Sequence, residues 1–331
     1  MLKVGLPRAL LYYQYYPYWS VFFETLGTKV VPSPVTNEDI LMSGVQNAVD
    51  DCCLPVKCYF GHVLSLQDQV DVLFVPRVVC DRIGGLQCPK ILGLPDMVQG
   101  LWEPTLGIQA PTVDVRRGHA GWEQGLRAVG RRLGISGATM HRAQSNAEFA
   151  QSFYQRALEG GLVTHEAYQA TRRAVGLPAM VCRNKQGRFA AAELKIGVLG
   201  HPYLIYDPYL SQDLLARLNS FGVTPITAEM VPGALVSAGN ARLVKPLFWS
   251  LGQRILGAAA HFLDGHVDGV IHLTSFGCGP DSLVGEMIAR WARRGKRVPF
   301  MSLSFDEHSG EAGLVTRLEA FVDMLKRRAV R

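Results

Sequence analysis

The sequence lacks the features of an exported or membrane-spanning protein. Its first residues, Met1-Leu2-Lys3-Val4-Gly5-Leu6-Pro7, enter a strand pattern at once, without the charged region, apolar region and cleavage site of a signal peptide. No apolar run approaches the length of a membrane span. We therefore expect a cytoplasmic protein with no membrane partner. In that reducing compartment its seven cysteines are expected to be metal ligands or core residues rather than disulfides.

Motifs for nucleotides and nucleic acids are also missing. The first strand is followed by Leu6-Pro7-Arg8, not by Gly-x-Gly-x-x-Gly, and there is no Walker A loop. A second strand ends in Leu199-Gly200-His201-Pro202, which is equally unlike a phosphate-binding loop. We expect neither NAD nor ATP binding, so ATP hydrolysis would belong to a partner. No nucleic-acid recognition motif or aromatic-basic interleaving is present either.

Length and composition favour two globular domains. The chain has 331 residues, of which 48% are hydrophobic and 19% are charged. Its net charge is +6, with basic clusters at 290–297 and 326–331. We interpret these clusters as solvated helix ends, since cations are favoured there. Docking of an acidic protein or of a phosphorylated ligand such as coenzyme A is the alternative.

The chain repeats itself loosely, and the repeat predicts the fold. Lys3-Val4-Gly5-Leu6-Pro7, followed by an aromatic-rich helix from about Ala9 to Leu26, resembles Lys195-Ile196-Gly197-Val198-Leu199, followed by a helix from about Gln212 to Ser220. Val70–Val75 has a partner in Val267–Ile271. Short apolar runs that alternate with helical patterns are typical of parallel sheets. We predict an α/β protein with two Rossmann-like, doubly wound parallel-sheet domains.

A helical insertion is expected between these domains. Residues from about 116 to 175 carry apolar side chains at helical spacing, and the polar stretch 182–188 is typical of a linker or an exposed loop. The predicted boundaries are residues 1–115 for the first domain, 116–190 for the insertion and linker, and 191–331 for the second domain. Cys182 falls in the linker and is expected to lie away from any site.

Three cysteines share one local pattern that predicts their chemistry. They occur in Cys53-Leu54-Pro55, Cys88-Pro89 and Cys278-Gly279-Pro280, each before a helical pattern. Proline suits the first helical turn, so all three thiols are predicted at helix N-termini, where free amides and the helix dipole favour a thiolate. Three thiolates placed alike indicate one shared iron–sulfur cluster. The simplest geometry that uses all three is a cluster in the interdomain cleft.

Other interpretations of the cysteines remain open at this point. Cys52, Cys58 and Cys80 lack the full pattern and are interpreted as small buried hydrophobes. They would instead complete a larger cluster if they were ligands. Structural zinc is disfavoured because it uses closely spaced cysteine pairs. A nucleophilic Cys278, with His201 or His308 as its base, would explain only one of the three helix-start cysteines.

Polar residues at strand ends are the candidate catalytic groups. Glu307 and His308 follow the predicted strand Pro299–Leu303, and His201 follows the strand that begins at Lys195. In α/β folds this edge binds ligands, so the three residues could donate protons or bind substrate beside the metal. Helix capping is the alternative, and it accounts best for Ser309.

At these residues the sequence resembles the acyl-CoA dehydratase activase-related proteins, relatives of the subunits of 2-hydroxyacyl-CoA dehydratase and benzoyl-CoA reductase. The resemblance runs along nearly the whole chain, through Gly5-Leu6-Pro7-Arg8-Ala9-Leu10, Cys53-Leu54-Pro55-Val56-Lys57, Gly61-His62-Val63, Cys88-Pro89-Lys90, Leu94-Pro95-Asp96-Met97, Gly200-His201-Pro202-Tyr203, Phe276-Gly277-Cys278-Gly279-Pro280-Asp281-Ser282 and Asp306-Glu307-His308. It implies two Rossmann-like domains and an oxygen-sensitive cluster held by Cys53, Cys88 and Cys278.

The resemblance also implies a function in anaerobic metabolism. The dehydratase relatives receive one low-potential electron from an ATP-hydrolysing iron–sulfur activase and act on a CoA thioester. We therefore expect an iron–sulfur redox protein with a [4Fe-4S] cluster, an activase partner and an unidentified substrate, with a dimer left open. The alternatives are a non-catalytic cluster-binding scaffold or electron-transfer subunit, and a zinc-stabilised binding module. Whether the chain is itself an enzyme stays undecided.

Overall fold

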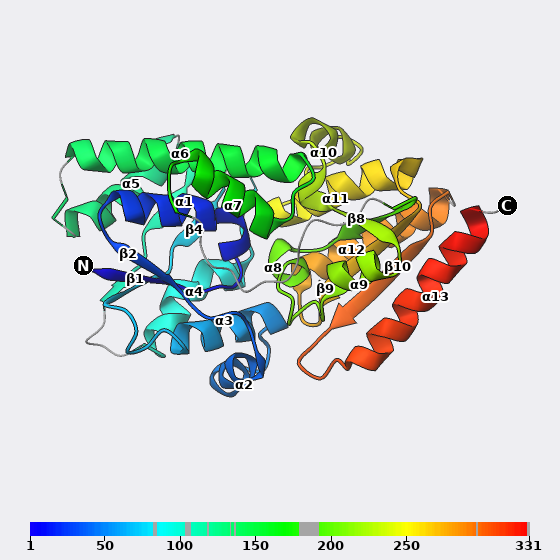
Figure 1. The fold of residues 1–331 in the computed structure, drawn as a ribbon, viewed down its shortest axis with the longest axis horizontal. Helices are drawn as coiled ribbons and strands as arrows, with labels where there is room; N and C mark the ends of the chain where they lie inside the picture. Colours follow the sequence, from blue (N-terminus) through cyan, green and yellow to red (C-terminus); the bar gives the residue numbers. More distant parts are fainter. Residues whose placement is uncertain are drawn as a thin grey trace. The chain divides into compact units, whose positions relative to one another are not determined.

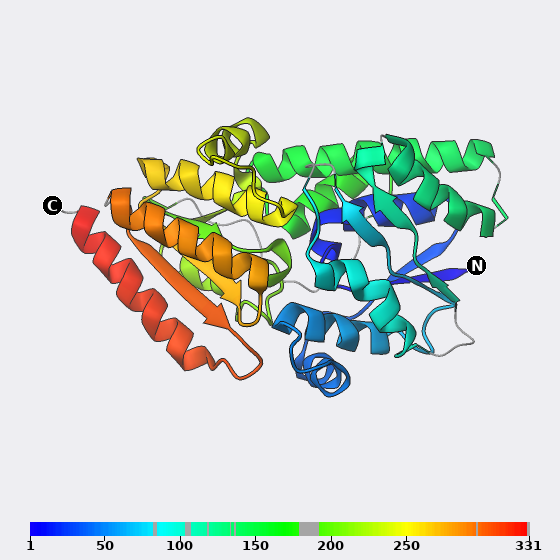
Figure 2. The same cartoon turned by 180° about the vertical axis from the view of Figure 1, so that it is seen from behind.

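The computed structural model describes residues 1–81, 85–102, 107–117, 119–132, 134–135, 137–178, 192–295 and 297–329. By its internal contacts the chain divides into two units. The first comprises Met1–Ala157 with the described part of Ala167–Val181, and the second comprises Leu158–Glu166 with the described part of Cys182–Arg331. Figures 1 and 2 show the elements of both units from opposite sides. Cys182 and the predicted linker 182–188 lie outside the described residues.

The first unit is built on a four-stranded parallel sheet in the order β2-β1-β3-β5. Its strands are β1 (Lys3–Leu6), β2 (Lys29–Pro32), β3 (Val72–Phe74) and β5 (Gly107–Gln109), and β4 (Arg77–Cys80) pairs with β6 (Thr112–Asp114) in a separate parallel ribbon. Its helices are α1 (Tyr12–Thr25), α2 (Glu38–Asn47), α3 (Leu54–Leu64), α4 (Pro89–Gln99), the short η1 (Val115–Arg117), α5 (His119–Arg132), α6 (Gly137–Glu159) and α7 (Thr164–Ala174), the last two of which contribute a few residues to the second unit.

Helices cover both faces of this sheet. The connection from β1 to β2 crosses the sheet in one direction, and those from β2 to β3 and from β3 to β5 cross it in the other. Right-handed crossovers therefore place α1 on one face and α3 and α4 on the other (Figure 1). Trp19 and Phe23 of α1 contact the ring of Phe74 edge-on, with centroids 5.6 and 4.9 Å apart. These aromatic contacts pack α1 against the sheet.

The helical insertion packs on the outer side of α1. The hydroxyl of Tyr154 donates to the backbone oxygen of Tyr13 at 2.9 Å. In α7, the hydroxyl of Tyr168 donates to Ser20 Oγ at 3.3 Å. Two helices of the insertion, α6 and α7, are thus hydrogen-bonded to α1.

The second unit has a four-stranded parallel sheet in the order β10-β9-β7-β8. Its strands are β7 (Leu194–Leu199), β8 (Val223–Thr227), β9 (Gly269–Ser275) and β10 (Phe300–Phe305). Its helices are α8 (Pro202–Ile205), α9 (Leu214–Ser220), the short η2 (Ala228–Met230), α10 (Gly233–Asn240), α11 (Ser250–His261) with a π-helical extension η3 (Phe262–His266), α12 (Gly279–Gly295) and α13 (Glu311–Ala329).

The two sheets have the same connectivity. The first order is β2-β1-β3-β5, and the second, read in the opposite direction, is β8-β7-β9-β10. In both, the second strand of the unit lies at one edge beside the first, and the third and fourth follow on the other side. A local contact repeats as well. Asp71 accepts the backbone N–H of Lys3 at 2.7 Å in the first unit, and Asp268 accepts that of Lys195 at 2.7 Å in the second. The prediction of two doubly wound α/β domains is confirmed, and the loose sequence repeat reflects a repeated structure.

A close helix crossing is also repeated. A methyl group added to Gly61 would lie 1.8 Å from the backbone oxygen of Ile40, so α3 touches α2 directly. A methyl group added to Gly257 would lie 2.3 Å from the backbone oxygen of Val236, so α11 touches α10 in the same way. Only glycine permits such backbone contact.

Two helices begin later than the sequence predicts. The first was expected from about Ala9 but starts at Tyr12, because Leu10 has φ of 51° and leaves the helical region. The helix expected from about Gln212 starts at Leu214, because Gln212 and Asp213 have φ of 51° and 56°. Left-handed backbone at non-glycine residues has no clear sequence signal.

Candidate functional site

Cys53 and Cys88 occupy equivalent places in the first unit. Each is the N-cap of a helix with proline in its first turn, and their backbones match, with φ/ψ of −69°/154° and −66°/153°. The Cys53 oxygen accepts the N–H of Lys57 at 3.1 Å, and the Cys88 oxygen accepts that of Leu92 at 3.0 Å. Crossover helices of a parallel sheet begin at its carboxyl edge, where α/β folds bind ligands. The predicted helix-start position of both thiols is confirmed.

Cys88 and Lys90 both affect the pKa of Cys53. Burial raises the pKa of Cys53 most strongly, and negative charge on Cys88 raises it further. Lys90, in the first turn of α4, lowers the pKa of both thiols. Its ammonium also donates to the backbone oxygen of Asp51. Cys53 and Cys88 therefore form a pair with one cation nearby.

The helix starts favour the thiolate form of this pair, as expected, but burial opposes that effect more strongly. Burial raises the pKa of both thiols above the ordinary value, and the backbone N–H groups of Val56, Lys90 and Ile91 offset only part of that effect. A buried anion needs a compensating positive charge. A bound metal cation supplies that charge and deprotonates a coordinating thiol outright.

In the second unit, Cys278 follows β9 and directly precedes α12. Its backbone oxygen accepts the N–H of Ser282 at 3.1 Å, which is the first hydrogen bond of the helix. Gly277 has φ of 75°, a left-handed conformation that permits the sharp turn between strand and helix. The predicted helix-start position of Cys278 is therefore confirmed.

Cys278 lies in a buried polar cluster with His201, Asp281 and His272. His201 Nε2 is 3.8 Å from Cys278 Sγ and 4.0 Å from Asp281 Oδ1. His272 Nε2 lies 3.2 Å from the same Asp281 oxygen. Asp281 is fully buried, and the two histidines and Cys278 are at most 8% exposed. These four buried side chains therefore face one another rather than solvent.

Two glycines permit this arrangement. Gly200 lies where an added methyl group would meet the backbone oxygen of Leu273 at 2.5 Å, so the loop that carries His201 passes close over β9. Gly285 of α12 lies where an added methyl group would meet His272 Cε1 at 2.8 Å. The imidazole of His272 thus occupies space that a larger residue of α12 would fill.

The neighbours of Asp281 lower the pKa of its carboxyl. Burial alone would raise that pKa, but interactions with His201, His272 and Thr274 hold it below its ordinary value. Burial lowers the pKa of His201. Within the described residues, His201 Nδ1, His272 Nδ1 and Asp281 Oδ2 are buried without a hydrogen-bond partner. Buried polar atoms without partners are uncommon and indicate a ligand or ordered water.

Glu307 and His308 follow β10, whose last residue Phe305 pairs with Ser275 at the end of β9. Their loop thus lies at the same edge of the sheet as the Cys278 loop. Glu307 is half-buried and His308 is exposed. The turn is closed by Asp306, whose carboxylate accepts the His308 N–H at 3.0 Å and the Ser309 hydroxyl at 2.8 Å. Ser309 thus takes part in a local turn, as the capping interpretation expects.

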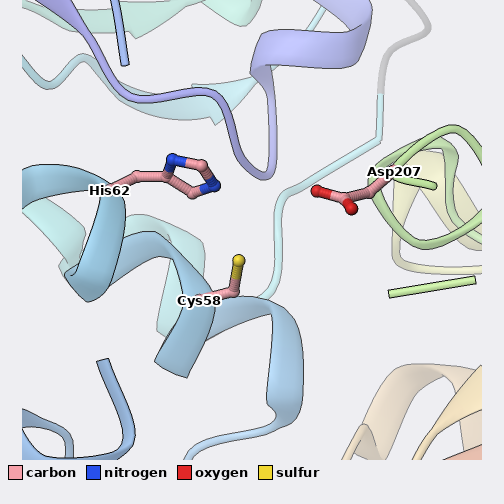
Figure 3. A group of neighbouring side chains, drawn as sticks. All are labelled: Cys58, His62 and Asp207. Carbon is pink, nitrogen blue, oxygen red and sulfur yellow. The ribbon is translucent and has the colours of Figure 1, made fainter. Parts of the chain in front are cut away.

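The remaining described cysteines are also buried. Cys52, Cys58 and Cys80 are all buried, and the last two are fully so. Cys80 ends β4, where its thiol donates to the backbone oxygen of Asp81. Cys58 and His62 lie one turn apart on α3 and offer ligand atoms within 4.8 Å of each other (Figure 3).

His62 is nevertheless a satisfied core histidine. Its Nδ1 lies 2.9 Å from Ser33 Oγ, and its Nε2 lies 2.9 Å from Thr36 Oγ1, so both ring nitrogens are already hydrogen-bonded. Asp207, also drawn in Figure 3, accepts the backbone N–H groups of Tyr209 and Leu210 in a local turn. These interactions favour structural roles for both residues.

Sequence reasoning missed Asp281 and His272 as site residues. Asp281 was visible in the Cys278-Gly279-Pro280-Asp281 motif, three residues beyond the cysteine, which is one helical turn. His272 lies inside an apolar strand, and a lone histidine in such a strand gives no signal of its own. Only the packing of α12 on β9 shows that the two side chains meet.

The fold and the site together define a class of protein: an α/β protein with two doubly wound units and cysteines at crossover-helix starts. Residues 3–231, more than half of the chain, match the family described as CoA enzyme activase uncharacterised domain, and the protein belongs to that family. The matched region contains Cys53, Cys88 and His201, whereas Cys278 and Asp281 lie beyond it. A comparison with curated proteins found no match. Among the described residues, no helix has the length and apolarity to cross a membrane.

Proposed function

We propose that this protein is the iron–sulfur redox component of a CoA enzyme activase system. In this proposal Cys53, Cys88 and Cys278 ligate a [4Fe-4S] cluster that receives low-potential electrons from an ATP-hydrolysing activase and delivers them to a substrate. The observation that carries it is that all three thiols directly precede the first turn of a crossover helix. Membership of the activase family supports the setting.

The residues around the thiols suit such a group. Three thiolates carry three negative charges, and Lys90 offers a cation beside two of them. The helix starts offer backbone N–H groups that stabilise a coordinated sulfur. When bound, the cluster would supply one-electron transfer and, with three thiolates on four irons, one iron open to substrate.

Proton donation is the role proposed for His201, Glu307 and His308. His201 is the best placed of the three, because its Nε2 lies 3.8 Å from Cys278 Sγ. Glu307 and His308 lie on the loop after the neighbouring strand. A proton donor must come within hydrogen-bond reach of substrate, so all three side chains would act at the carboxyl edge of the second sheet.

The first test is the cofactor content of cysteine variants purified without oxygen. We expect Cys53→Ser, Cys88→Ser and Cys278→Ser each to lose most bound iron and acid-labile sulfide. The matched controls Cys52→Ser, Cys58→Ala and Cys80→Ala should keep both. Loss of about half of the iron in any control would instead indicate a larger, double-cubane type of cluster with more thiolate ligands. Normal iron in all three test variants would contradict the proposal.

The second test separates catalysis from electron transfer. We expect His201→Ala, Glu307→Gln and His308→Ala to keep iron content and melting temperature while turnover falls by about 10²-fold or more for a lost proton donor. The wild type and the variants could all accept electrons from the activase and yet show no turnover. That result would favour an electron-transfer subunit over an enzyme. Lost stability with full activity would make these residues structural.

A further inference from the structure

The second unit contains three closely spaced donors for a single metal ion. His201 offers an imidazole nitrogen, Cys278 a thiol sulfur and Asp281 a carboxylate oxygen, and these three atoms all lie within 4.8 Å of one another. All three residues are buried. Neither Cys53 nor Cys88 is needed for this set.

The spacing fits tetrahedral coordination. Bonds of ~2.3 Å to sulfur and ~2.0 Å to nitrogen at a tetrahedral angle hold the two ligand atoms about 3.5 Å apart. The separation of Cys278 Sγ from His201 Nε2 is 3.8 Å. His201 Nε2 and Asp281 Oδ1 are 4.0 Å apart, somewhat wider than the roughly 3.4 Å that a shared ion requires. Side-chain rotations of a few tenths of an ångström close that difference.

The charge balance of the ligands and the contacts of Asp281 support the same site. A thiolate and a carboxylate balance a divalent cation, so the assembly would be neutral in a buried place. His272 Nε2 contacts Asp281 Oδ1 at 3.2 Å and so orients the carboxylate, as outer contacts of metal ligands commonly do. The second carboxylate oxygen, Asp281 Oδ2, is buried and has no hydrogen-bond partner among the described residues, so a small rotation of the carboxylate can present either oxygen to the ion.

We propose that Cys278, His201 and Asp281 bind one divalent transition-metal ion of the zinc class when no cluster occupies Cys278. The mixed sulfur, nitrogen and oxygen set selects such an ion over magnesium or calcium, which prefer oxygen alone. Three protein ligands leave a fourth position for water or another ligand. The ion and the cluster compete for one thiolate, so their binding is mutually exclusive.

Cobalt titration of the full-length, cluster-free protein tests this inference. We expect one Co²⁺ per chain, a thiolate-to-cobalt charge-transfer band, visible bands typical of tetrahedral cobalt, and displacement by Zn²⁺. Cys278→Ser should abolish the charge-transfer band. His201→Ala and Asp281→Asn should weaken binding by at least about 10-fold, and His272→Gln by about 10-fold. Thermal melts of each variant check that the fold is kept.

The controls are the thiols of the first unit. Cys53→Ser and Cys88→Ser should bind Co²⁺ as the wild type does, although both should lose the cluster. Cobalt binding that survives Cys278→Ser, that fails in Cys53→Ser, or that shows no sulfur band would overturn the inference. If Asp281→Asn fails to fold, His201→Ala and Cys278→Ser still test the metal-site inference. Absence of a cluster in the wild type would contradict the proposed function but leave the cobalt result intact.

Discussion

Cys53 and Cys88 each combine a buried sulfur with the backbone N–H groups of a helix start, and Lys90 is their shared cation. Burial raises the pKa of both thiols, and the Lys90 charge opposes that effect. In the cluster-free protein the thiolate population of the pair should therefore depend on Lys90. Because the thiolate is the reactive form, alkylation rates report this dependence directly.

We predict that Lys90→Met slows alkylation of Cys88, the more exposed of the two thiols, by a few-fold at pH 8. Mass spectrometry of iodoacetamide-treated, cluster-free protein gives the rate at each cysteine. The matched control is Lys29→Met, a substitution at the start of β2 that should leave the rate unchanged. Equal rates in the wild type and Lys90→Met would show that Lys90 does not act on the pair.

His62 is the residue that should couple stability to pH. Burial lowers its pKa from 6.5 to about 3, and Ser33 and Thr36 hold the neutral ring. Its folded pKa lies below its unfolded one. The stability from the neutral ring is therefore fully present above about pH 6.5 and is lost as the pH falls from there toward 3.

We predict that the free energy of unfolding of the wild type falls between pH 6.5 and 4, and that His62→Gln flattens this fall at the cost of about 1–3 kcal/mol at pH 7. Urea denaturation across that range measures both effects. Met42→Gln, at an exposed position of α2 without an ionisable side chain, is the control and should leave the pH profile unchanged. The same steep profile in His62→Gln would assign the pH dependence to other groups.

At the scale of elements, the two close helix crossings hold the crossover layers together. Gly61 and Gly257 each place a helix against the backbone of its neighbour. A methyl group cannot fit at 1.8 or 2.3 Å from a carbonyl oxygen, so the helices must separate or shift. Displacement of α3 would also move Cys53, its N-cap.

We predict that Gly61→Ala and Gly257→Ala each lower the free energy of unfolding by about 2 kcal/mol or more, despite the better helix propensity of alanine. Gly313→Ala in α13 is the control, since an added methyl group there meets nothing within 4 Å. It should be neutral or stabilising by up to about 1 kcal/mol. Denaturant titrations compare the three. Wild-type stability in Gly61→Ala would show that the α2–α3 crossing is looser than described.

Elements with local signals were predictable from the sequence. Proline after each cysteine marked the helix starts at Cys53, Cys88 and Cys278, because proline is favoured in the first turn. The delayed starts of α1 and α9 were not predictable, because Leu10 and Gln212 adopt left-handed backbone without a glycine signal. The contact between His272 and Asp281 depends on the packing of α12 over β9, which no local pattern encodes.

At the scale of the molecule, the repeated structure explains the number of candidate ligands. Cys88 and Cys278 begin equivalent helices, α4 and α12. Cys53 begins α3, and the equivalent helix of the second unit, α11, has Trp249 as its N-cap. Within the described residues, three of these four equivalent helix starts therefore carry a cysteine. In the proposed cluster, three thiolates would leave one iron of a cubane without a protein thiolate.

The most direct test of this account is the iron and sulfide content of the wild-type protein after anaerobic purification and reconstitution. We predict about four iron and four acid-labile sulfide per chain, with an EPR signal on one-electron reduction that disappears in Cys278→Ser. A chain that binds no sulfide, and holds instead only a single zinc or iron ion, would contradict the central claim that Cys53, Cys88 and Cys278 ligate an iron–sulfur cluster.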